Sequence, residues 1–200
     1  LLTYLFLGFV FLSALTLRNH FDYLTRALLI AGSVNVLYCL WVIAFGDFIG
    51  WSNPYGNILG TLGNPNFIGS FLGIFFAACF ALSLDKHLTS RIRLAAALAL
   101  PIIAFEIVKS HAIQGRVVAG LGVGIIGFLY IRTGYSRLLL SVYSAGILVV
   151  GSLALLGSLQ IGPLTSYIYK TSVSLRGQYW LAGWNTGATH PFTGVGMDSF

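Results

Sequence analysis

Three basic side chains, Lys109, Arg116 and Arg176, are the residues of this sequence best suited to chemistry. Arginine presents a planar set of N–H donors that holds phosphate oxygens in pairs, whereas lysine supplies a compact positive charge. Lys109 and Arg116 bound a short polar link between two apolar segments, and Arg176 lies in a polar, aromatic stretch near the end of the chain. One interpretation is a clamp for pyrophosphate in which Lys109 is the weaker member. The other is that these side chains only extend to the lipid headgroups.

The stretch that carries Arg176 also contains Tyr179, Trp180 and Trp184, and a helix is expected over about 173–185. Residues four apart lie on one face of a helix, so Arg176, Trp180 and Trp184 share a face. Tryptophans beside a cation are typical of a helix in the membrane–water interface. The stretch lacks a run of about 20 apolar residues, so this helix is not expected to cross the bilayer.

Single residues predict both ends of this helix. Ser172 or Ser174 can act as the N-cap, because a hydroxyl can accept a hydrogen bond from a free amide of the first turn. Gly187 is expected to end the helix, since glycine readily adopts the left-handed conformation that follows a last turn. His190-Pro191 prevents continuation beyond that point.

Two runs of residues in this segment form a recognisable pair. Residues 172–180 read Ser-Val-x-x-Arg-x-x-Tyr-Trp, and residues 190–200 read His-Pro-Phe-x-Gly-Val-Gly-Met-x-x-Phe. The pair resembles the signature that opens the large external loop of the O-antigen ligase and polymerase superfamily. The resemblance implies a polytopic glycosyltransferase that uses polyprenyl-pyrophosphate-linked glycans, and it does not separate ligases from polymerases.

The resemblance also implies roles for particular residues. In the family, an arginine at the start of the corresponding helix, usually in a Ser-Arg-Gly context, contacts the lipid pyrophosphate. Here Ser110 is followed by His111, and the arginine comes later, at Arg116 after a Gln-Gly pair. Arg116 is nevertheless the residue to which the pyrophosphate role carries over. Tyr179 and Trp180 would pack on the glycan or the lipid.

A catalytic base is not expected within this chain. The family's candidate catalytic histidine lies further along the external loop, beyond Phe200, and His190 is interpreted as structural. The four histidines are scattered, and no external pair of acidic residues is available to hold a divalent cation. The sequence therefore predicts a reaction without a metal or other cofactor.

The composition indicates an integral membrane protein, because only 8% of the residues are charged and 57% are hydrophobic, against about 25% charged in soluble domains. The net charge of +6 does not indicate nucleic acid, since the basic residues occupy short links between apolar runs. Cys39 and Cys79 fall inside apolar segments, so a disulfide is not expected. Without a starting Met or a signal peptide, the chain is interpreted as a fragment of a longer protein.

Apolar segments of about 20 residues predict an all-α fold, a polytopic transmembrane helix bundle with about six spans and a C-terminal interfacial helix. The fourth and fifth segments are short and can extend into the 109–116 link. The bundle is expected over 1–161, and 162–200 begins a large extracytoplasmic loop. The six expected spans are 1–17, 27–49, 67–84, 94–108, 117–131 and 138–161.

The distribution of basic residues predicts the orientation of these spans. Cytoplasmic links carry an excess of Lys and Arg, and seven of the eleven lie in links one, three and five. This places 50–66, 109–116 and 162–200 outside the bacterial cytoplasmic (inner) membrane. The four outer cations, which orientation leaves unexplained, are Lys109, Arg116, Lys170 and Arg176.

Polar residues inside or beside the apolar segments have two interpretations each. The turn 63–66 reads Gly-Asn-Pro-Asn, with Asn66 the expected N-cap of the third span; it is either a membrane-surface turn or a wall of a glycan-lipid site. Glu106 is either a functional intramembrane acid or, by preference, the partner of Lys109 at i, i+3. Pro101 is expected to break the fourth span, and Asn35 lies inside the second.

The predicted function is glycan transfer from a polyprenyl-pyrophosphate carrier to an acceptor lipid or glycan, on the outer face of the membrane and among its lipids. Charge develops on the leaving phosphate, so preorganised cations lower the barrier. The alternative is a polysaccharide polymerase of the same superfamily, or a membrane transporter of glycolipid or small solute. The transporter ranks second, because neither Pro101 nor Asn35 has a counterpart in a repeat, and a non-catalytic scaffold is third.

Overall fold

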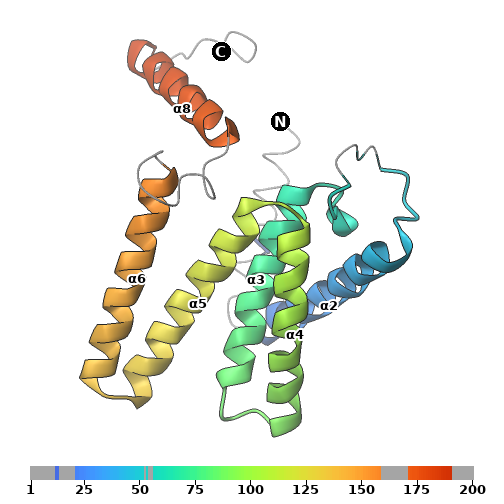
Figure 1. Ribbon diagram of the computed structural model, residues 1–200, viewed down its shortest axis with the longest axis vertical. Helices are drawn as coiled ribbons and strands as arrows, with labels where there is room; N and C mark the ends of the chain where they lie inside the picture. The colour runs from blue at the N-terminus through green and yellow to red at the C-terminus, as the bar shows by residue number, and fades with distance from the viewer. Residues whose placement is uncertain (1–11, 14–20, 52, 54–55, 159–170, 191–200) are drawn as a thin grey trace. The chain divides into compact units, whose positions relative to one another are not determined.

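The computed structural model describes residues 12–13, 21–51, 53, 56–158 and 171–190 (Figure 1). Within these ranges the chain is helical and contains no strand, which confirms the predicted all-α class. The first expected span, 1–17, lies almost entirely outside the described residues. The helices are α2 (Phe21–Phe45), the short 3-10 helix η1 (Gly60–Leu62), α3 (Pro65–Leu84), α4 (Ser90–Lys109), α5 (Ile113–Gly134), α6 (Arg137–Ser158) and α8 (Thr171–Thr189).

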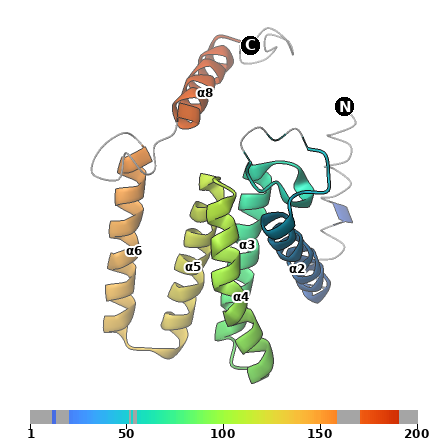
Figure 2. The same ribbon diagram turned by 45° about the vertical axis from the view of Figure 1, so that its right-hand side comes forward.

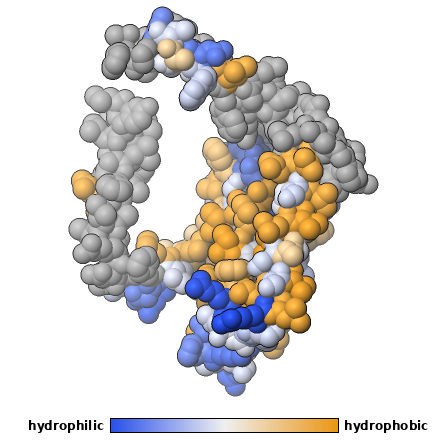
Figure 3. Space-filling model, turned by 90° about the vertical axis from the view of Figure 1, so that its left-hand side faces the viewer, coloured by the Kyte–Doolittle hydropathy of each residue, from blue (hydrophilic) through white to orange (hydrophobic). Residues whose placement is uncertain are grey.

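Four of these helices are long and apolar enough to cross a membrane: α2, α3, α5 and α6. Helix α4 has a similar length but is not among them, because it carries Arg91, Arg93, Glu106 and Lys109. Figure 3 shows many hydrophobic residues on the face in view, with hydrophilic residues at its lower end and a smaller group higher up. Such a face is the surface that lipid or other helices would cover. The structure therefore supports a membrane protein with four candidate spans rather than a demonstrated six.

Several predicted helix boundaries are corrected. Asn64 is the N-cap of α3, because its side chain accepts a hydrogen bond from the Asn66 amide at 2.8 Å. Asn66 itself lies inside the helix, after Pro65, which suits a first helical position. Pro101 does not break α4, which continues through it from Ser90 to Lys109. A proline inside a membrane helix removes one backbone hydrogen bond, and packing on neighbouring helices can tolerate that loss.

Helix α3 is the centre of the first compact unit, which covers residues 1–134. It packs most extensively against α5 and α4, and α2 crosses it obliquely (Figures 1 and 2). The buried apolar side chains of this unit form one cluster from α2, the following link, α3 and α4: Cys39, Ile58, Ile68, Leu72, Phe75, Cys79, Ala96, Ile103 and Ile107. Cys39 and Cys79 are both free thiols in this cluster.

Glycines bring α3 and α5 into close contact. A Cβ atom on Gly115 of α5 would lie 2.5 Å from the carbonyl oxygen of Gly69 on α3. A Cβ atom on Gly73, one turn further along α3, would lie 2.7 Å from the carbonyl oxygen of Gly115. Small residues at this spacing let two membrane helices approach along their backbones. This contact fixes the start of α5 against α3.

The link between α2 and α3 turns back into the bundle. Ile58, Leu59 and Gly60 are buried, and the Asn35 side-chain oxygen accepts hydrogen bonds from the Thr61 amide (3.1 Å) and hydroxyl (2.9 Å). The turn expected at 63–66 follows directly, with Gly63 in the left-handed region and α3 beginning at Pro65. Asn35, an unexplained polar residue of the second span, therefore anchors the link.

The second compact unit, residues 135–200, contains α6 and α8. The apolar stretch of α6 is mostly exposed, so most of its surface is available to lipid or to other protein. Helix α8 confirms the helix expected over 173–185 but is longer at both ends, so Ser172 and Ser174 lie inside it and neither is its N-cap. It passes through Gly187 and ends just before His190, where the Thr189 hydroxyl donates to the Asn185 carbonyl oxygen at 2.9 Å. The predicted domain boundary at 161/162 lies outside the described residues.

Candidate functional site

The corner between α4 and α5 is the best-defined part of the candidate site. Helix α4 extends to Lys109 and α5 begins at Ile113, so both helices extend into the polar link as the sequence allowed. His111 occupies the left-handed region at a φ of 55°, which non-glycine residues seldom adopt and histidine tolerates better than most. Its amide donates to the Val108 carbonyl oxygen at 3.1 Å. The corner is therefore tight and holds the two helix ends close together.

Ser110 fastens this corner from inside. Its side chain is fully buried, and its hydroxyl donates to the Ile107 carbonyl oxygen at 2.8 Å and accepts from the Ala112 amide at 3.3 Å. A Cβ atom on Gly69 of α3 would lie 3.0 Å from the same hydroxyl, so α3 packs directly against the corner. From the sequence, Ser110 stood out only because His111 follows it where the family has arginine. In the structure it holds the end of α4 and the start of α5 in place.

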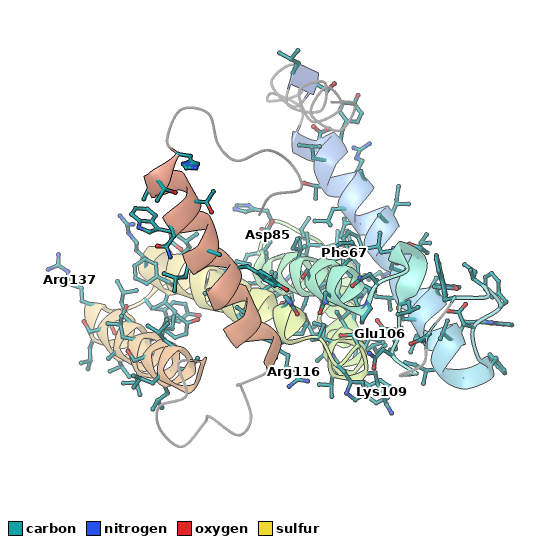
Figure 4. The ribbon with its side chains drawn as sticks, turned by 90° about the horizontal axis from the view of Figure 1, so that it is seen from above. Phe67, Asp85, Glu106, Lys109, Arg116 and Arg137 are labelled. Atoms are coloured by element: carbon teal, nitrogen blue, oxygen red, sulfur yellow. The ribbon has the colours of Figure 1, made fainter. Side chains whose placement is uncertain are left out.

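Two of the three predicted site cations, Lys109 and Arg116, flank this corner. Arg116 is exposed in the first turn of α5, immediately after the buried Gly115 (Figure 4). Free backbone amides at a helix N-terminus and the helix dipole both favour an anion at this position. The Lys109 ammonium lies 5.6 Å from the centre of the Phe105 ring. The corner thus carries an exposed guanidinium near the start of α5 and an exposed ammonium at the end of α4.

The predicted pair between Glu106 and Lys109 is wrong. Glu106 is fully buried, and neither of its carboxylate oxygens has a hydrogen-bond partner. Lys109 instead lies over Phe105. A spacing of three residues allows two side chains to meet on one face of a helix. In α4, however, Glu106 is buried in the core and Lys109 is exposed at the surface.

The other predicted cation, Arg176, lies in the middle of α8, four residues before Trp180. The side chains of Arg176 and Trp180 are outside the described part of the structure. Tyr179 and Trp184 are 62% and 77% exposed, as an interfacial or ligand-facing position would require. Because α8 belongs to the second unit, the meeting of Arg176 with Arg116 stays a prediction.

The end of α2 and the link that follows it place aromatic rings beside an acid. The Tyr38 hydroxyl donates to a carboxylate oxygen of Asp47, which also accepts from the Ile49 amide at 2.9 Å, and the Tyr38 ring meets Phe48 edge to face. Trp51 lies against Gly63, where a Cβ atom would be 2.7 Å from the indole ring. Exposed aromatic rings suit both the membrane interface and a sugar face. The proposed wall of a glycan-lipid site remains an expectation.

The sequence indicated the residues that would bind a ligand. It did not indicate Gly69, Ser110 and Gly115, which hold the helices of the site together. The one available signal was the Gly69-x-x-x-Gly73 spacing, which is typical of close helix contacts. The described residues contain no group of three or more His, Cys, Asp or Glu side chains placed to hold a metal ion.

Comparison of the chain with family models, with curated proteins and with solved structures gives no match. The family resemblance therefore rests on the two motif runs at residues 172–180 and 190–200.

Proposed function

We propose that this chain is part of an O-antigen ligase-like glycosyltransferase of the bacterial cytoplasmic membrane. Such an enzyme would move a glycan from a polyprenyl-pyrophosphate carrier to an acceptor on the outer face. The supporting observation is the α4–α5 corner, which presents exposed Arg116 in the first turn of a helix and Lys109 at the end of the preceding one. In this proposal 1–17 and α4 also cross the membrane, which gives six spans, and α8 lies in the interface.

In the proposed reaction, negative charge develops on the pyrophosphate leaving group, close to the cations of the site. An acceptor hydroxyl oxygen forms a bond to the anomeric carbon while the bond from that carbon to the pyrophosphate oxygen breaks. The electron pair of the broken bond stays on pyrophosphate, and the hydroxyl proton passes to a base outside this chain. Arg116, Lys109 and the first amides of α5 would stabilise the leaving group, and Arg176 would complete the clamp. Tyr179 and Trp180 would contact sugar or lipid.

Replacing Arg116 or Arg176 by lysine in the full-length protein should lower glycan transfer roughly tenfold or more, because lysine keeps the charge but loses the paired donors. The measurement is the transfer rate with a purified lipid-linked donor. The Arg132→Lys variant, changed at the opposite end of α5, is the matched control and should retain the wild-type rate. Protein abundance should stay near normal in all three variants.

Wild-type transfer rates in both clamp variants would reject the clamp and leave lipid-headgroup contact as the better account. A loss of transfer in Arg132→Lys equal to that in Arg116→Lys would show that the assay responds to any change of arginine. If the clamp is correct, glycan transfer falls in Arg116→Lys and stays at the wild-type rate in Arg132→Lys.

The proposed orientation has its own test. In a cysteine-free background, a membrane-impermeant thiol reagent added to intact cells should label Ser52→Cys and not Ser90→Cys. The reason is that Lys86, Arg91 and Arg93 mark the Ser90 end as cytoplasmic. The structure adds that Lys86 lies 5.9 Å from the Tyr130 ring centre, so the third and fifth links share one end of the unit. Labelling at Ser90→Cys alone would overturn the outer-face site.

A transporter is the second candidate, and one observation favours it. Buried ionisable residues within membrane bundles commonly serve ion or substrate pathways, and Glu106 is fully buried without a partner. A transporter would move labelled substrate into proteoliposomes without joining it to an acceptor. A transferase would form the joined product in detergent, where no compartments exist. The two assays on one preparation separate the candidates.

A further inference from the structure

Glu106 is the one buried side chain in the described part of the chain whose polar atoms lack a hydrogen-bond partner. Three polar residues are buried there: Asn35, Glu106 and Ser110. Asn35 bonds to Thr61 and Ser110 to the α4 backbone, but both oxygens of Glu106 are unpaired. Its relative exposure is 0%. Such a group needs a partner that the protein side chains do not supply.

Among the described residues, no cation of the surrounding elements pairs with this carboxyl. On α2 the Cys39 thiol is close enough to interact with it electrostatically, and on α3 the Cys79 thiol belongs to the same core cluster. Lys109 on α4 lies over an aromatic ring, and Arg116 on α5 is exposed. The described neighbours are therefore the Cys39 thiol and the hydrocarbon of the core cluster, which cannot stabilise a negative charge.

An unpaired carboxylate in this position would be strongly destabilising, because burial removes the water that solvates the charge and no cation replaces it. Binding a proton removes the charge without needing space. We propose that Glu106 is a proton-binding site inside the bundle, and that the bound proton keeps α4 packed against α2. Loss of the proton would force the carboxylate towards water and open this contact. The proposal does not depend on glycan transfer.

The position of Glu106 gives the proton a structural effect. It lies three residues before Lys109 and four before Ser110, which fastens the α4–α5 corner. A movement that takes the carboxylate out of the core therefore also displaces the corner. The protonated form is the closed one, so raising the pH favours opening.

Infrared difference spectroscopy on the full-length protein tests the proton directly. Subtracting the spectrum of the Glu106→Gln variant from that of wild type at neutral pH should reveal a protonated carboxylic acid carbonyl band. The control is Asp22→Asn at the exposed start of α2, whose difference spectrum should contain carboxylate bands instead. Loss of carboxylate bands in Glu106→Gln would overturn the proposal. Glutamine has the shape of the neutral acid, so this variant should fold.

The opening is tested through Cys39, which is fully buried beside Glu106. In a Cys79→Ser background, alkylation of Cys39 by a membrane-permeant maleimide is measured as the pH is raised. Any thiol reacts faster at higher pH, so the informative quantity is the ratio of wild type to Glu106→Gln. That ratio should rise about tenfold, which corresponds to about 1.4 kcal/mol. An unchanged ratio would show that ionisation of Glu106 does not open the contact.

Discussion

The Gly115→Leu variant should lose stability by about 3 kcal/mol or more, the largest effect expected of a single substitution in this chain. The added side chain would start from a Cβ atom 2.5 Å from the Gly69 carbonyl oxygen. The obstacle is backbone, so no side-chain rotation can relieve the clash, and α3 and α5 must separate. For a protein of this size the unfolding midpoint should fall by roughly 6–12 °C.

The matched control is Gly120→Leu on the same helix, because a Cβ atom at Gly120 meets nothing within 4 Å. Both changes replace glycine by a good helix former, which by itself stabilises a helix by roughly 0.5–1 kcal/mol. Thermal unfolding in detergent, followed by circular dichroism, should therefore leave Gly120→Leu at or above the wild-type midpoint. Equal midpoints for the two variants would show that α3 and α5 do not meet at Gly115.

The Asn35→Leu variant should free the α2–α3 link from the bundle at a cost of about 2 kcal/mol. The substitution removes the acceptor of two hydrogen bonds from Thr61, one from the amide and one from the hydroxyl. The Thr61 amide would lose its partner in a part-buried position. Local opening of this link should become about 30-fold more frequent, since 1.4 kcal/mol corresponds to a factor of ten.

Hydrogen exchange measured by mass spectrometry on peptides that cover 57–64 reports this opening. Peptides from α4 provide the internal control and should exchange as in wild type. A double-mutant cycle with Thr61→Val isolates the contact, because the two substitutions should be clearly less than additive. Strict additivity, or unchanged exchange in 57–64, would mean that Asn35 does not hold the link.

The amino-acid sequence by itself determined the helical class, four of the candidate spans and the polar corner between α4 and α5. A hydrocarbon layer requires every backbone group to bond within its own segment, so long apolar runs have little choice but helix. The end of α8 follows a similarly local rule. The helix continues through Gly187, which ends helices only weakly, and stops at Thr189. His190 precedes Pro191, and a residue before proline disfavours the helical conformation.

Only the tertiary structure decided what these helices do with their polar and small residues. The Asn35–Thr61 bonds join positions 26 residues apart, and Gly69 meets Gly115 on another helix. Spacing along α4 favoured a pair between Glu106 and Lys109, yet the packing of α4 buries one and exposes the other. Local spacing states which residues can meet within one helix. Which face a helix turns to its neighbours depends on the fit of all the surrounding helices, and no single segment encodes that fit.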